Sequence, residues 1–254
     1  MLRPNWPAPA NIVAYSTTRQ GLLTFTGLSQ APYDSFNLGD HVDDQAAAVA
    51  ANRCELVNHC DDLSAIAWLD QVHGTEVVSA QLTLDYPLRG DASITSEVGL
   101  ACGVLTADCL PVLFCRRDGR QVAAAHAGWR GLRAGMLAET VSAFDCAPSG
   151  LLAWIGPAIS QPHFEVGAEV REAFLAGFPN LAFEDIRQHF VAVSEKPGHF
   201  LADLPGLACA QLEALGVGWV GNSGRCSYAE NQHFYSYRRQ RVTGRQLSFI
   251  YIQQ

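Results

Sequence analysis

Residues 105–131 set the strongest limit on the fold, because they have the pattern of a β-hairpin with reactive side chains near its open end. Apolar runs flank Asp118-Gly119, and Asp-Gly in that context is a strong signal for a two-residue hairpin turn. With this turn, Pro111 faces His126, and Cys109 lies diagonal to His126 on the same face. A slip of one residue would separate the two side chains. The register therefore predicts that the thiol and the imidazole can share one metal ion.

The composition is that of a globular protein with a sizeable core. Of the 254 residues, 48% are hydrophobic and 17% are charged. The formal net charge of −8 argues against nucleic acid as a main partner, since phosphate binding favours a basic surface. The N-terminus lacks the apolar segment of a signal peptide, and polar residues interrupt the most apolar window, residues 98–115. We therefore expect a cytoplasmic protein with no membrane partner.

The eight cysteines are too dilute for a disulfide scaffold, and no two of them form a C-x-x-C pair. We therefore expect free thiols. Six of these residues occur in apolar or helical surroundings and are predicted to be small buried hydrophobic side chains. These six are Cys54, Cys60, Cys102, Cys115, Cys146 and Cys209.

Apolar periodicity predicts a mixture of strands and helices. Strands are predicted at residues 12–17, 65–69, 76–79, 100–105, 112–115, 122–125 and 151–155, with a second hairpin formed by 234–239 and 247–252. Helices are predicted at 45–59, 132–144, 164–176 and 204–215. No repeat or low-complexity linker divides the chain. The expected fold class is α+β, as a single domain over residues 1–254 with mixed sheets.

His126 ends a predicted strand and directly precedes Gly128-Trp129-Arg130-Gly131 and a helix. Catalytic groups often occupy such strand ends, beside a helix N-terminus that attracts anions. Arg130 favours a phosphate site here. The alternative is a histidine satisfied by a backbone hydrogen bond beside a solvated arginine, and the local sequence does not choose between the two.

Asp108-Cys109 interrupts an apolar stretch in which an aspartate is costly without a partner, so we expect a functional role for the pair. A cysteine near a histidine permits two chemistries, a thiolate metal ligand or a nucleophile paired with a base. His73 would complete a set of three protein ligands, the number typical of catalytic zinc sites. The spacing of His73 and Cys109 matches no zinc finger, so spacing alone does not establish a metal.

Multi-residue motifs along nearly the whole chain resemble the YfiH family of laccase-domain proteins. The motifs lie at residues 16–19, 33–39, 71–74, 106–111, 126–131, 154–159, 164–167, 225–228 and 236–239. The resemblance implies the family's layered α/β/β/α sandwich, a fold grouped with cysteine hydrolases. One departure is the altered loop at residues 20–29, which would change substrate preference if it lines the pocket.

The same resemblance implies a zinc-dependent purine nucleoside phosphorylase that acts on adenosine, inosine and methylthioadenosine, with adenosine deaminase as a side activity. Its partners would be a nucleoside and phosphate. His73, Cys109 and His126 would be the zinc ligands. Cys109, His126 and Asp108 are the expected catalytic residues, with Asp108 as the candidate proton carrier. The expected substrate contacts are Arg19, Asn37, Gln71 and Arg130.

Three alternatives remain. A metal-free hydrolase or amidase using Cys109 and His126 would act on a cell-wall precursor, a role proposed within the family. Older family names describe copper-dependent polyphenol oxidases, and copper could occupy the zinc site in vitro. Laccase chemistry is disfavoured, because the chain has only Met1 and Met136 as axial candidates and has no His-x-His pair. A binding module with structural zinc is disfavoured by a set of only three ligands.

The C-terminal arginines form a separate cluster, for which we expect a solvated edge strand that discourages aggregation. A phosphate or nucleic-acid grip is the less favoured interpretation, given the negative net charge. The cluster consists of Arg238, Arg239, Arg241 and Arg245.

Overall fold

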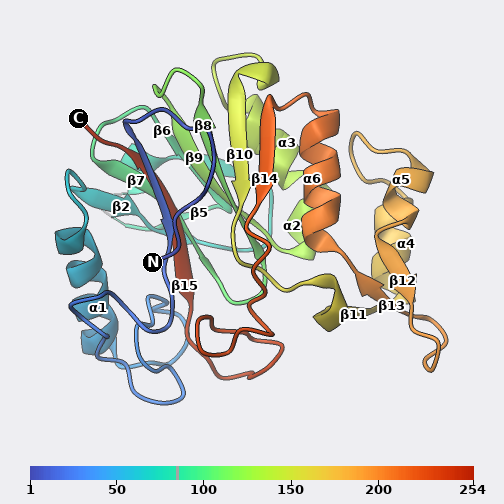
Figure 1. Ribbon diagram of the computed structural model, residues 1–254, viewed down its shortest axis with the longest axis horizontal. Helices are drawn as coiled ribbons and strands as arrows, with labels where there is room; N and C mark the ends of the chain where they lie inside the picture. Colours follow the sequence, from blue (N-terminus) through green and yellow to red (C-terminus); the bar gives the residue numbers. More distant parts are fainter. Residues whose placement is uncertain (84–85) are drawn as a thin grey trace.

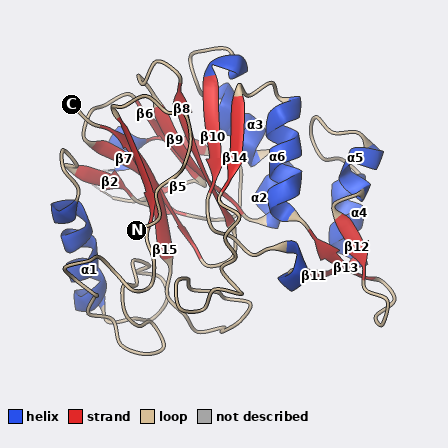
Figure 2. Ribbon diagram, viewed as in Figure 1, coloured by secondary structure: helices blue, strands red, loops and turns tan. Residues whose placement is uncertain are grey.

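Two β-sheets packed face to face form the centre of the molecule, and helices cover the outer face of each (Figures 1 and 2). The structure is a computed structural model that describes residues 1–83 and 86–254. The layers follow the order α/β/β/α, so the expected layered α+β fold with mixed sheets is confirmed.

The smaller central sheet has four strands in the order β1-β15-β7-β2. β15 is antiparallel to both neighbours, whereas β2 is parallel to β7. The strands are β1 (Ile12–Ser16), β15 (Gln246–Ile252), β7 (Leu100–Thr106) and β2 (Ala65–Ala67). Helix α1 (Ala46–His59) covers its outer face through Leu56, which packs among apolar side chains of the sheet.

The larger sheet has six strands in the order β14-β10-β8-β9-β6-β4. β8 pairs antiparallel with β9 and β10, and the edge strands β14 and β4 run parallel to their neighbours. The strands are β14 (Trp219–Asn222), β10 (Leu151–Ile155), β8 (Leu110–Arg116), β9 (Val122–Ala127), β6 (Ala92–Thr95) and β4 (Val77–Ser79). Helices α2 (Trp129–Ala134), α3 (Met136–Ser142) and α6 (Leu204–Ala214) cover its outer face.

Strand β8 shows why the central strands are apolar on both faces. Val112 and Phe114 point toward the helices, while Leu113 and Cys115 point into the layer between the two sheets. All four are fully buried. A strand covered on both faces has a continuous apolar run rather than an alternating pattern, as the sequence shows here.

A smaller lobe lies beyond α6, at the right of Figure 1. It combines a three-stranded sheet with two short helices. The elements are β11 (Glu165–Gly167), β13 (His199–Ala202), β12 (Phe190–Ala192), α4 (Ala168–Leu175) and α5 (Phe183–Arg187). The remaining elements are the strand pair β3 (Leu69–Asp70) and β5 (Leu88–Arg89) and the 3₁₀ turns η1 (Ala80–Thr83), η2 (Pro148–Gly150) and η3 (Gln161–His163).

The hairpin register is confirmed, with Pro111 opposite His126 and Phe114 opposite Ala123. The predicted second hairpin is wrong. Residues 234–239 form loop and turn, and β15 pairs with β1 and β7 instead, both of which lie far away in the sequence. The C-terminal arginines therefore do not form an edge strand.

Three local predictions also need correction. The helix predicted at residues 132–144 is two helices, because Gly135 adopts a φ of 101° between them. The helix predicted at residues 164–176 begins only at Ala168, after β11. Among the cysteines expected to be buried, Cys54 is exposed, and Cys146 and Cys209 are partly buried.

Within the described residues, no helix has both the length and the apolar character that crossing a membrane requires.

Candidate metal centre

His73, Cys109 and His126 converge from three separate segments of the chain. Their candidate ligand atoms all lie within 4.8 Å of one another. Cys109 Sγ is 3.8 Å from His73 Nε2, and the two imidazole rings meet edge to face with centroids 4.8 Å apart. In tetrahedral zinc sites, bonds of about 2.0–2.3 Å put neighbouring ligand atoms about 3.5 Å apart. Among residues 1–83 and 86–254, this is the one group of three such side chains arranged for an ion.

The hairpin positions two of the three ligands. His126 is buried near the end of β9, and Cys109 immediately precedes β8. Gly128 lies beside them, and a Cβ atom there would lie 2.7 Å from His73 Cδ2 and 3.0 Å from Cys109 Sγ. A side chain at Gly128 would therefore occupy the space in which the three ligands meet.

Asp91 supports both histidine ligands through hydrogen bonds. Its buried carboxylate lies 2.8 Å from His126 Nδ1 and accepts hydrogen bonds from the backbone N–H groups of Val72, His73 and Gly74 at 3.2, 2.9 and 2.6 Å. These bonds stabilise His73 at its positive φ of 61°. With Nδ1 bound to Asp91, Nε2 of His126 remains for an ion, as in other carboxylate–histidine–metal arrangements.

Asp91 is not among the site residues predicted from the sequence. The signal was a carboxylate directly before a short strand, with Gly90 before it and Ala92 after it. An acid there is costly unless it is paired, as it is here with His126 and the backbone N–H groups of residues 72–74.

The electrostatics of the site favour a thiolate. Burial opposes ionisation of Cys109, but His126 and His73 outweigh it and lower the pKa of the thiol to about 6. Burial also works against a charged His126, but Cys109 and Asp91 raise the pKa of its imidazole to about 9. Burial tends to raise the pKa of Asp91, yet its hydrogen bonds to His126 and Gly74 hold it below the usual value. Because the thiolate is the form of cysteine that binds metals, this donor set fits a zinc ion.

Asp108 lies in the turn between β7 and β8, outside both strands, and it has a φ of 102°. One carboxylate oxygen accepts a hydrogen bond from Ser227 Oγ, and the other accepts one from the backbone N–H of Arg238, both at 2.7 Å. These contacts fix the turn that carries Cys109. The role of Asp108 as a proton carrier stays a prediction.

The amide groups of Gln71 and Asn37 are engaged by the protein itself. Gln71 pairs with both the N–H and the carbonyl of Leu105, at 2.8 and 2.9 Å. The Oδ1 atom of Asn37 accepts hydrogen bonds from the backbone N–H groups of Gly39 and Arg245. Both side chains hold segments next to the metal ligands, and their expected contact with substrate stays a prediction.

The two predicted cationic contacts differ in their surroundings. Arg19 binds the Asp34 carboxylate at 3.1 Å and the Asn231 carbonyl at 3.2 Å, so its charge is already paired. Arg130 is exposed and stacks on Trp129, with its guanidinium carbon 4.5 Å from the ring centroid. Arg130 is the second residue of helix α2, which has only six residues.

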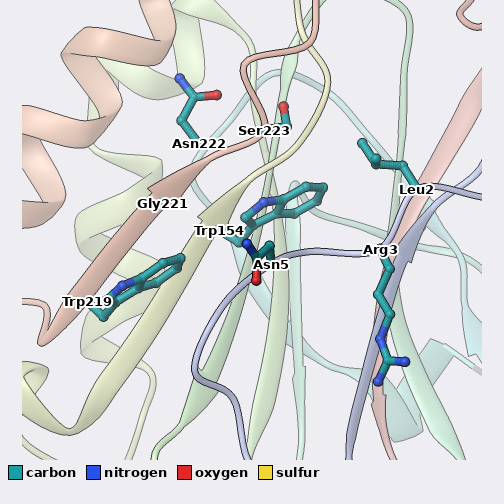
Figure 3. Close-up of a pocket in the computed structure, with 8 residues that line it drawn as sticks. All are labelled: Leu2, Arg3, Asn5, Trp154, Trp219, Gly221, Asn222 and Ser223. Atoms are coloured by element: carbon teal, nitrogen blue, oxygen red, sulfur yellow. The ribbon is translucent and has the colours of Figure 1, made fainter.

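A separate cavity of about 320 Å³ lies where the N-terminal segment meets β10 and β14 (Figure 3). Trp154 and Trp219 line it together with Arg3, Asn5 and Asn222. None of the three candidate metal ligands lines this cavity, so it is distinct from the metal centre.

Comparison with known proteins identifies relatives over nearly the full chain. Residues 13–253 match the family described as multi-copper polyphenol oxidoreductase laccase. The chain is 49% identical to a purine nucleoside phosphorylase of Pseudomonas aeruginosa, over 99% of this chain and 98% of that protein. It is 46% identical to purine nucleoside phosphorylase YfiH of Escherichia coli strain K12, with the same coverage.

Solved structures agree with the sequence relationship. Neisseria meningitidis protein NMB0706 superposes with a TM-score of 0.91 at 45% identity, covering 100% of this chain and 99% of that one. YlmD of Geobacillus stearothermophilus superposes with a TM-score of 0.88 at 32% identity, covering 100% and 96%. The chain therefore belongs to the laccase-like YfiH family.

Proposed function

We propose that this protein is a zinc-dependent purine nucleoside phosphorylase acting in the cytoplasm. The observation that carries the proposal is the convergence of His73, Cys109 and His126 within 4.8 Å, in a chain 46–49% identical to proteins named purine nucleoside phosphorylases. Adenosine, inosine and methylthioadenosine are the proposed substrates, with inorganic phosphate as the second substrate.

The proposed reaction exchanges one bond at the sugar for another. An oxygen of hydrogen phosphate forms a bond to C1′ of the ribose, and the bond from C1′ to the purine nitrogen breaks. The purine nitrogen gains the proton that the hydrogen phosphate carried. The site must therefore hold an oxyanion next to the sugar and stabilise charge on the departing base. A zinc ion held by His73, Cys109 and His126 would supply Lewis acidity with one coordination position left open.

The protein's own groups prepare this site. Asp91 binds His126 through Nδ1 and fixes the backbone around His73, so both imidazoles are oriented before substrate arrives. The low pKa of Cys109, about 6, keeps its sulfur ionised at neutral pH. Arg130, exposed after the strand that carries His126, is one cation available to phosphate.

Adenosine deamination is a proposed side activity of the same site. It would need a water activated for attack on C6 of adenine, and a three-ligand zinc centre can provide such a water. The P-C-x-x-C element of the common nucleobase deaminases does not occur in the sequence. Any deamination would therefore use a different arrangement of groups from theirs.

A cysteine hydrolase is the second candidate, and the pairing of Cys109 with His126 is the observation that favours it. Their opposite pKa shifts, to about 6 and about 9, describe a thiolate–imidazolium pair in the metal-free protein. Copper oxidase chemistry has less support. Met136, the first residue of α3, is fully buried in the core, and the described residues contain no second group of metal-binding side chains for further copper ions.

Elemental analysis followed by turnover assays separates these candidates. Purified protein is expected to hold about one zinc per chain, and to release adenine from adenosine only when phosphate is present, with ribose 1-phosphate as the second product. Cys109→Ala should lose both zinc and turnover, whereas Cys54→Ala, at an exposed cysteine, should keep both. Active metal-free protein that iodoacetamide inactivates would overturn the proposal in favour of the hydrolase.

A further inference from the structure

Arg245 directly precedes β15, which pairs with the strand that leads to Asp108 and Cys109. In the sheet, Gln246 pairs with Thr106, so the antiparallel register sets Arg245 across from Ala107. The next residues after Ala107 are Asp108 and Cys109. Arg245 therefore enters the edge of the candidate metal centre from the C-terminal segment of the chain.

The backbone and side chain of Arg245 are both held in place. Its backbone N–H donates to Asn37 Oδ1 at 2.8 Å, and its Nη1 donates to the carbonyls of Thr243 and Gly244 at 3.0 Å. A Cβ atom at Gly39 would lie 2.7 Å from Arg245 Cγ, so the glycine leaves room for the arginine stem. The position of this guanidinium is therefore built into the fold, and Asn37 contributes to the site through it.

The charge of Arg245 has no carboxylate partner. Among residues 1–83 and 86–254, no acidic oxygen lies within 4.0 Å of its guanidinium, and Nε and Nη2 donate no hydrogen bond to a protein acceptor. Burial lowers the pKa of Arg245, while Cys109 and Asp108 partly oppose that shift. Burial and Arg245 also lower the pKa of the His41 imidazole, although Asp40 acts in the opposite direction.

The nearby acids are committed elsewhere. Both oxygens of Asp108 accept hydrogen bonds, from Ser227 and from the backbone of Arg238. The other arginines of this region are satisfied too, since Arg239 donates to three backbone carbonyls and Arg19 binds Asp34. A partly buried cation with two free donor positions is a strong site for an oxyanion.

We propose that Arg245 binds the phosphate oxyanion beside His73, Cys109 and His126, a role no comparison assigns to it. The inference rests on the proposed phosphorolysis and supplies the residue that positions its second substrate. Nε and Nη2 of Arg245 are the donors left for the phosphate, and Asn37 and the carbonyls of residues 243–244 hold the arginine in place. The C-terminal arginines are thus not merely a solvated surface cluster, as the sequence pattern suggested.

Steady-state kinetics on the zinc-loaded enzyme tests the proposal with matched variants. Losing hydrogen bonds to a charged group weakens binding by roughly ten- to a hundredfold. Arg245→Gln should therefore raise KM for phosphate by about that factor and leave KM for inosine within about twofold, and Arg245→Lys should recover part of the loss. Arg241→Gln, at an exposed arginine that stacks on Tyr237, is the control and should leave KM for phosphate unchanged.

Two measurements do not depend on turnover. Calorimetric titration of wild-type protein with inorganic phosphate should show binding that Arg245→Gln weakens, and phosphate but not chloride should protect Arg245 from phenylglyoxal in wild-type protein. The phenylglyoxal experiment uses wild-type protein, so it still tests the proposal if Arg245→Gln does not fold. Three outcomes would overturn the assignment: phosphate binding by Arg245→Gln as tight as that of the wild type, protection by phosphate of Arg130 instead of Arg245 from phenylglyoxal, or loss of zinc from the variant. Absent phosphorolysis with intact phosphate binding at Arg245 would instead refute only the proposed function.

Discussion

Asp91 Oδ1 lies 2.8 Å from His126 Nδ1, and both side chains are buried. The same carboxylate also binds the backbone on either side of His73, so one acid orients two of the three candidate ligands. Loss of such a supporting contact typically lowers metal affinity about 10–100-fold. We expect Asp91→Asn to show a loss of this size in zinc competition against a chromogenic chelator.

Asp145→Asn is the matched control for that measurement, because Asp145 is exposed and pairs with Arg116 away from the ligands. The control should bind zinc like the wild type. Equal zinc affinity in Asp91→Asn and wild type would show that the carboxylate does not support the ligands.

Gly128→Ala should disrupt the centre without changing any ligand. The added methyl group would lie 2.7 Å from His73 Cδ2 and 3.0 Å from Cys109 Sγ. Overpacking of this kind costs about 1–3 kcal/mol, and relief of the clash would move the ligands apart. Zinc stoichiometry and thermal unfolding measure the effect. Gly177→Ala, with no atom within 4 Å of the added methyl, should keep its zinc, and a Gly128→Ala protein that does the same would contradict the expectation.

Thiol reactivity in the metal-free protein should follow the ionisation of Cys109. With its pKa lowered to about 6, the thiolate predominates at pH 7 and the neutral thiol at pH 5. Iodoacetamide should therefore label Cys109 about tenfold faster at pH 7 than at pH 5, since the thiolate is the nucleophile. Cys60, whose pKa burial raises to about 11, should remain unlabelled.

Peptide mass spectrometry in a Cys54→Ser background, which removes the exposed thiol, measures the two rates. Zinc should protect Cys109 at both pH values. A labelling rate that rises only above pH 8 would show that the histidines do not stabilise the thiolate.

Asp108 can be tested as an anchor against its predicted role as a proton carrier. Ser227→Ala leaves one buried carboxylate oxygen without its donor, which costs about 1–3 kcal/mol of stability. If Asp108 only anchors the turn, Ser227→Ala and Asp108→Asn should both lower the melting temperature and leave the pH profile of kcat unchanged. A lost acidic or basic limb in Asp108→Asn alone, with zinc retained, would establish proton transfer.

The sequence predicted the hairpin because its determinants are local. Asp118-Gly119 at the turn fixes the register, and the register brings Cys109 and His126 together. His73 is 36 residues from Cys109, so only the family resemblance could add it. Asp91 was missed for the same reason, since its partners lie at residues 72–74 and at His126.

The failures have a common physical cause. The pattern of β15 shows that it is a buried strand but does not name its partners, which are β1 and β7. Likewise, the motif positions Asn37 and Gln71 are engaged in hydrogen bonds to the backbone of neighbouring segments. A sequence motif indicates that a particular side chain is required. Only the hydrogen-bond partners of that side chain show whether it contacts substrate or stabilises the fold.

The strand order of the smaller sheet also governs when the centre can form during synthesis. β15 is the last strand along the chain, yet it lies between β1 and β7 and separates the earliest strand from the one that leads to Cys109. Folding on the ribosome therefore cannot close this sheet until residues 246–252 have emerged. Until then β1 and β7 each present an unpaired edge, and such edges can pair with other chains before the sheet closes.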